Sequence, residues 1–86
     1  MTKIILDICI GETLKTFRKR VGYTQMEVVQ KAHLYGSKMS ESTYSKIEQG
    51  SRNIHVSDLV ILKLVLGFSY EDLFKKIENS ISELHE

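Results

Sequence analysis

The sequence lacks proline and tryptophan altogether, and only five glycines interrupt its 86 residues. Because proline and glycine most often break helices and strands, their scarcity predicts long regular elements joined by short loops. The single cysteine, Cys9, cannot form a disulfide within the chain and stands in an apolar stretch, as a small core residue would. This use of cysteine fits a reducing cytoplasm. No apolar run is long enough to span a bilayer, so no membrane partner is expected.

Residues that commonly carry catalysis are scarce and scattered. His33, His55 and His85 do not follow the spacing of metal ligands, and Cys9 lacks the basic setting that activates a nucleophilic thiol. No glycine-rich segment has the pattern of a phosphate-binding loop. These absences argue against an enzyme, and we expect no metal, no cofactor and no small-molecule ligand.

The charge is small overall but unevenly distributed. The formal net charge is +1 at pH 7, yet residues 1–66 hold ten basic and six acidic side chains, while residues 67–86 hold two basic and five acidic. A basic body with an acidic tail suits a protein whose body meets phosphate and whose tail does not. The length predicts one domain over residues 1–86.

Apolar spacing predicts three helices in the first half of the chain. The first covers about residues 8–21. The second opens at Thr24, where Glu27 three residues later completes a capping box. The third covers residues around 40–49, after the polar connector HLYGSKMS. The residues expected on the inner faces of these helices are Leu14, Phe17, Arg18, Val21, Val28, Val29, Ala32, Tyr44 and Ile47.

Two further helices are expected after residue 55. The segment VSDLVILKLVLG is apolar nearly all round, so we expect it to be buried on most sides. Ser69 then caps a fifth helix, with Asp72 in the capping-box position. Residues 3–10 form either a short strand or the lead-in to the first helix. The predicted fold is all-α, a compact five-helix bundle with room for a short extended segment at the N-terminus.

Three segments resemble a known family in their order and spacing: LKTFRKRVGYTQMEVV, STYSKIEQGSRN and LVILKLVLGFSYEDLF. From Leu14 to Phe74 the chain is similar to the Cro and phage-repressor (XRE) type of helix-turn-helix domain, which includes restriction–modification controller proteins. The resemblance implies the phage-repressor fold, with a core over about 11–74. It also implies sequence-specific binding of double-stranded DNA by a transcriptional regulator, either a repressor or an autoregulator.

The resemblance also implies which residues meet DNA. The third helix lies in the major groove and meets base edges with its N-terminal half. Its base-reading residues are Ser40, Glu41, Ser42, Thr43, Ser45 and Lys46. The residues expected on the phosphate backbone are Thr24, Gln25, Lys38, Ser51, Arg52 and Asn53. Arg18 and Glu48 match a family pair that forms a structural salt bridge between the first and third helices.

Several of these positions have a plainer explanation as solvated surface. Gln25 could simply begin a helix in solvent, and Lys46 points outward whatever the function. Glu41 near phosphates lowers affinity unless it accepts from a cytosine amino group. The connector HLYGSKMS is longer than the family's usual turn, which either changes the placement of the two helices or extends one of them. Ile54 stands where the family often has proline.

The C-terminal helix predicts a homodimer. Ile77, Ile81 and Leu84 continue an apolar stripe of coiled-coil spacing over residues 75–86, and a second copy would cover it. Phe74, at the start of the stripe, is expected to pack on the chain's own fourth helix. The alternative function is an antitoxin or other protein-interaction module on the same fold, in which the acidic tail binds a different protein.

Overall fold

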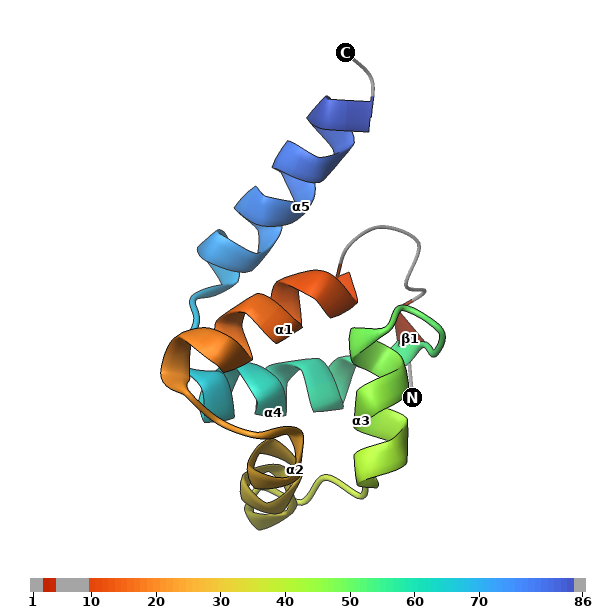
Figure 1. Ribbon diagram of the computed structural model, residues 1–86, viewed down its shortest axis with the longest axis vertical. Helices are drawn as coiled ribbons and strands as arrows, with labels where there is room; N and C mark the ends of the chain where they lie inside the picture. Colours follow the sequence, from red (N-terminus) through yellow and green to blue (C-terminus); the bar gives the residue numbers. More distant parts are fainter. Residues whose placement is uncertain (1–2, 5–9, 85–86) are drawn as a thin grey trace.

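The computed structural model describes residues 3–4 and 10–84, which form five helices and a two-stranded antiparallel ribbon (Figure 1). The helices are α1 (Ile10–Val21), α2 (Gln25–Leu34), α3 (Glu41–Glu48), α4 (Val56–Leu66) and α5 (Tyr70–Leu84). The strands are β1 (Lys3–Ile4) and β2 (Ile54–His55). The prediction of an all-α five-helix bundle with a short N-terminal extended segment is confirmed. Cys9 lies outside the described residues.

Local signals set the helix ends. The Thr24 hydroxyl accepts the Glu27 N–H at 3.1 Å, and the Glu27 carboxylate accepts the Thr24 N–H at 2.9 Å, which is the predicted capping box. Ser69 accepts the Asp72 N–H at 3.0 Å at the start of α5. Gly67 closes α4 with φ +74°, a left-handed conformation that glycine adopts without strain.

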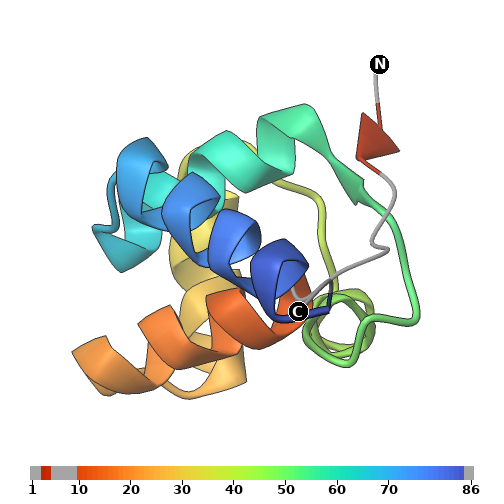
Figure 2. The same cartoon turned by 90° about the horizontal axis from the view of Figure 1, so that it is seen from above.

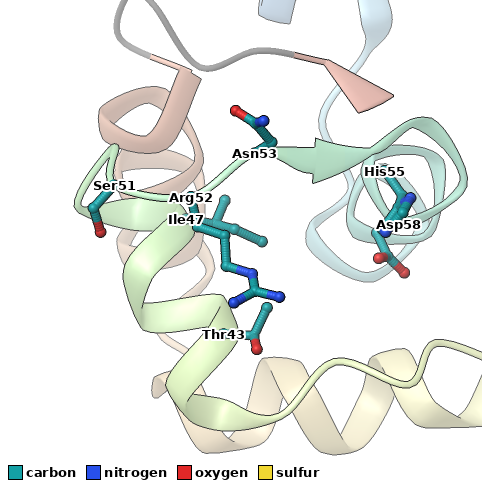
Figure 3. A pocket seen from close by; sticks show the side chains of 7 residues that line it. All are labelled: Thr43, Ile47, Ser51, Arg52, Asn53, His55 and Asp58. Carbon is teal, nitrogen blue, oxygen red and sulfur yellow. The ribbon is translucent and has the colours of Figure 1, made fainter. Parts of the chain in front are cut away.

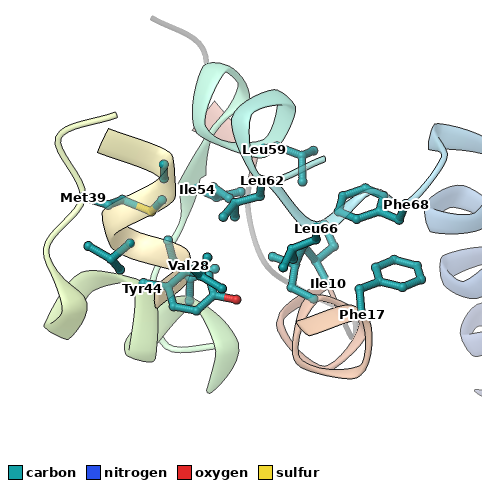
Figure 4. Packing of buried hydrophobic residues seen from close by; sticks show 14 of the residues in the cluster. Ile10, Phe17, Val28, Met39, Tyr44, Ile54, Leu59, Leu62, Leu66 and Phe68 are labelled. Atoms are coloured by element: carbon teal, nitrogen blue, oxygen red, sulfur yellow. The ribbon is translucent and has the colours of Figure 1, made fainter. Parts of the chain in front are cut away.

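The core lies where α1, α2, α3 and α4 meet (Figure 4). Phe17 of α1 is 1% exposed and stacks on Phe68, with ring centroids 4.6 Å apart. Tyr44 and Ile47 turn inward from α3, as predicted. Leu73 at the start of α5 is fully buried, and α5 packs against α1 before it extends beyond the body (Figures 1 and 2).

Helix α4 is covered on most sides by α1, α2 and β2, as predicted, but Val56, Val60 and Leu64 on its remaining side are 37%, 37% and 48% exposed, because nothing in the described chain covers that side. Two other burial predictions are wrong. Phe74 is 61% exposed, so it does not pack on α4. Val21 is 42% exposed because it is the last residue of α1, beyond the core. Apolar composition all round a helix does not say which side has a neighbour.

Gly11 allows the start of α1 to approach the end of α3 closely. A Cβ atom at this position would overlap the carbonyl oxygen of Ile47 and lie 2.6 Å from that of Glu48. Real Cβ atoms do not approach backbone so closely, so any side chain here would push the two helices apart. The sequence reasoning missed this contact.

Two further features bear on function. Within residues 3–4 and 10–84, no helix combines the length and the apolar character needed to cross a membrane. The same residues contain no group of three or more His, Cys, Asp or Glu side chains that could hold a metal ion.

Candidate nucleic-acid interface

Helix α3 is short and presents one face to solvent. The Ser40 hydroxyl caps it by accepting the Thr43 N–H at 3.1 Å. Tyr44, Ile47 and Glu48 are buried, which leaves the other side of the helix outward. The residues predicted to meet bases lie there: Ser40, Glu41, Ser42 and Lys46 are exposed, and Thr43 and Ser45 are partly exposed. The helix can therefore enter a groove without unpacking the core.

A hydrogen-bonded ion pair ties α3 to α1 and α2. Arg18 of α1 donates from Nε to Glu48 Oε2 at 2.7 Å and from Nη2 to Oε1 at 3.1 Å. Its Nη1 donates to the carbonyl oxygen of Tyr23 at 2.9 Å. Gln25, the first residue of α2, donates from Nε2 to Glu48 Oε1 at 3.0 Å. The Glu48 carboxylate thus fixes the start of α2 and the end of α3 relative to α1.

The environment of this pair keeps both partners charged. Burial acts to raise the pKa of Glu48, but the hydrogen bonds from Arg18 and Gln25 outweigh it and leave that pKa below its usual value. The hydrogen bond to Glu48 raises the pKa of Arg18. The Tyr44 hydroxyl is buried nearby without a hydrogen-bond partner among the described residues, and burial raises the pKa of that phenol.

The N-terminus of α2 lies beside this network. The capping box occupies the Thr24 N–H and the Thr24 hydroxyl oxygen. The hydrogen bond from the Thr24 N–H to the Glu27 carboxylate lowers the pKa of Glu27. The Thr24 hydroxyl still has its own proton to donate. Gln25 keeps a second amide hydrogen after bonding Glu48, because a side-chain amide carries two. Both predicted phosphate contacts therefore retain a donor.

The loop after α3 first bonds the end of that helix and then exposes a positively charged side chain. Ser51 donates from its N–H to the Lys46 carbonyl at 3.0 Å and from its hydroxyl to the same oxygen at 3.2 Å. This bonding gives Ser51 a structural role that the sequence reasoning did not foresee. Arg52 and Asn53 follow and are exposed. Ile54 is 1% exposed and returns the chain to the core.

The first two residues of the long connector, His33 and Leu34, belong to α2, and the rest forms a compact link. Helix α2 continues to Leu34, so residues 35–40 make the turn. Ser37 is buried, accepts the Met39 N–H at 3.1 Å and donates to Asp58 Oδ1 on α4 at 3.0 Å. His33 Nε2 lies 2.6 Å from the Met39 carbonyl oxygen. Lys38, between these anchors, is exposed.

A polar hollow lies between α3, the loop after it and the start of α4. Its volume is about 340 Å³. Its walls are formed by Thr43, Ile47, Ser51, Arg52, Asn53, His55 and Asp58. Figure 3 shows the Arg52 side chain running along α3 toward Thr43, with His55 and Asp58 across from it on the α4 side. None of the sequence patterns pointed to His55 or Asp58.

The arrangement is that of a helix-turn-helix domain: an outward helix, α3, is tied to α1 by a buried ion pair and to the start of the preceding helix, α2, by a hydrogen bond from Gln25. Residues 10–79 match the helix-turn-helix domain family, and the chain belongs to that family. Membership supports DNA-binding regulation of transcription as its class of function, and such domains are generally not enzymes.

Two solved structures share the fold. The wild-type restriction-modification controller protein C.Esp1396I is 23% identical, with a TM-score of 0.73 over 91% of this chain and 96% of that one. A mutant of the same protein is 22% identical, with a TM-score of 0.73 over 93% and 95%. None of the curated proteins compared with this chain matches it at a significant level.

Proposed function

We propose that this chain is a sequence-specific regulator of transcription, a repressor or autoregulator, that binds double-stranded DNA. Helix α3 and its two capping residues, together residues 40–49, lie in the major groove. The observation that carries the proposal is the outward face of α3, which bears hydrogen-bonding side chains while Arg18, Gln25 and Glu48 fix the helix from behind. A fixed helix of this kind suits readout, because base edges are told apart by the placement of donors and acceptors.

Each residue on the outward face of α3 has its own part in the proposed base contacts. Lys46 is long, exposed and able to donate to guanine O6 and N7, whereas Ser42 and Ser45 are short enough to let the helix approach. Glu41 accepts from a cytosine amino group, and its position in the first turn also suits the helix dipole. Thr43 and Ser40 complete the set at the start of the helix.

Phosphate contacts flank α3 on two sides. Thr24 and Gln25 donate from the start of α2, where the helix dipole also favours an anion. Lys38 donates from the turn before α3. Ser51, Arg52 and Asn53 lie on the loop after it. Such contacts position the protein on the duplex and carry little sequence information.

We also propose that two copies pair through α5 and α4. Tyr70, Phe74 and Ile81 are 43%, 61% and 42% exposed on α5, at helical spacing. Lys63 of α4 lies over the Tyr70 ring at 5.0 Å, which joins this row to the exposed Val60 and Leu64. An apolar surface across two helices is typical of a protein interface.

The predicted dimer residues contribute unequally to this surface. Ile77 is partly buried against its own core, so only its outer edge remains for a partner. Ile81 is exposed, and the Leu84 side chain lies outside the described part of the chain. In this proposal the chain acts as one domain, with a core over about 11–74 and residues 75–86 as the pairing element.

Selection of binding sites from random duplexes tests the regulator proposal. The wild type should select one sequence at moderate salt. Lys46→Ala should change or relax that preference, with a loss of about 1–3 kcal/mol in discrimination at one base pair. Gln25→Ala should weaken binding to all sequences alike. Lys19→Ala, an exposed lysine on α1, is the control for loss of charge and should select the wild-type site.

A wild type that binds no sequence preferentially overturns the proposal. The protein-interaction role would then take its place, with the exposed faces of α4 and α5 as the surface for a different protein.

A further inference from the structure

Two cations from different loops converge on one hollow. Lys38 precedes α3 and Arg52 follows it, yet both line a space of about 200 Å³ together with Met39, Thr43, His55 and Asp58. This space adjoins the larger hollow described above, and four of its lining residues are shared. Neither Lys38 nor Arg52 forms an ion pair with any other residue in the described part of the chain.

The turn holds Lys38 in place by its two neighbours. Ser37 is 7% exposed and bonded to Asp58 and Met39, while the Met39 side chain is 5% exposed and its carbonyl faces His33. A lysine between two buried anchors loses less backbone freedom on binding than one in a loose loop. The residues that lengthen the turn therefore present a cation at a fixed point.

Arg52 is held in a similar way. Ser51 is bonded to the end of α3, and Ile54 is buried and paired with Ile4 in the β1–β2 ribbon. Between them the Arg52 side chain lies along α3 (Figure 3). The Nδ1 atom of His55 is buried in the wall of the same hollow without a hydrogen-bond partner among the described residues.

The charge of the hollow fits one singly charged anion. Lys38 and Arg52 bring two positive charges and Asp58 one negative charge, and Asp58 also accepts the Ser37 hydroxyl and lies in the first turn of α4. The remaining positive charge is what one phosphodiester neutralises. Because the wall formed by Thr43 and Ile47 belongs to α3, a phosphate here would lie on a strand bordering the groove that α3 enters.

We propose that Lys38 and Arg52 together grip a single backbone phosphate of the DNA at this hollow. This inference rests on the proposed function. It assigns to the long turn a role of its own, since the turn adds a second cation to the contact made by the loop after α3.

A scan with single methylphosphonates tests the inference on the selected duplex. Each substitution removes the charge of one phosphate. The wild type should lose roughly tenfold in affinity at one position on that duplex. Lys38→Ala and Arg52→Ala should each bind the unmodified duplex roughly tenfold more weakly. Each should respond less than the wild type to the methylphosphonate at that same position, because one of the two cations is gone, and the double variant should not respond there at all. Lys19→Ala, at an exposed position of α1, should keep the wild-type response.

The outcomes separate this inference from the regulator proposal. If the response of the two variants is weakened at different phosphates, or at none, the shared grip is wrong and the regulator proposal stands. If the wild type binds no duplex, both fail. The inference is overturned in favour of a free anion if inorganic phosphate raises the melting temperature over chloride at equal ionic strength, in the wild type but not in Lys38→Ala, while no methylphosphonate position weakens binding of the wild type.

Discussion

Glu48 accepts three hydrogen bonds from two side chains, and this makes it the residue on which the interface depends most. Its side chain is 2% exposed and that of Arg18 is 11% exposed, so neither charge is well solvated without the other. Removing one member of a buried pair costs more than the pair contributes, because the other charge stays buried. The pair therefore fixes the register of α1, α2 and α3.

Glu48→Gln should lower the free energy of unfolding by about 3 kcal/mol at pH 7, since it leaves Arg18 unpaired. The pKa of Glu48 is below its usual value in the folded state, so the carboxylate stabilises the fold above the unfolded pKa. That stabilisation is lost as the pH falls through the folded pKa. Urea unfolding at several pH values should show the wild type and the variant converging in acid.

Glu71→Gln, at an exposed position of α5, is the matched control and should change stability little at any pH. A difference between wild type and Glu48→Gln that stays constant from neutral pH into acid would contradict the assignment.

At the scale of elements, the contact between α1 and α3 depends on Gly11. Gly11→Ala should destabilise the protein by about 1–3 kcal/mol, because the added methyl group overlaps the carbonyl oxygens at the end of α3. Chemical denaturation measures this loss. Lys19→Ala is an alanine control at an exposed position of the same helix and should be nearly neutral. Equal stability of the two variants would show that α1 and α3 can separate without cost.

The sequence predicted those elements whose signals are local. The capping box of Thr24 and Glu27, the cap at Ser69 and the stop at Gly67 act within a few residues, and the structure contains all of them. The pairing of Arg18 with Glu48 came from resemblance alone, because 30 residues separate them.

Contacts between segments that lie far apart in the sequence could not be predicted, because no local pattern marks them. Gly11 showed no pattern, since the backbone it approaches is more than 30 residues away in the sequence. The bond from Ser37 to Asp58 joins a turn to a helix that follows 21 residues later. Helix α4 is apolar on every side, so its sequence did not distinguish the buried Leu62 from the exposed Leu64.

At the scale of the whole molecule, α5 forms an arm on a small body. The chain measures 41 × 26 × 19 Å, and α5 accounts for the long dimension as it leaves α1 (Figure 1). The basic side chains proposed for DNA lie on the body, while residues 67–86 carry an excess of acidic side chains. An acidic arm that stays away from phosphate and exposes Phe74 is suited to contact a second copy.

Phe74→Glu should convert the proposed dimer to a monomer, because it places a charge at the centre of an apolar contact. Sedimentation over a range of concentrations measures the change. Asn79→Glu adds the same charge at an exposed position five residues on, on another side of α5, and should remain dimeric. Since paired half-sites about one helical turn apart require two linked copies, Phe74→Glu should also lose most of its affinity for such an operator. A wild type that is monomeric at every concentration, or a Phe74→Glu variant that still pairs, would move the interface away from α5.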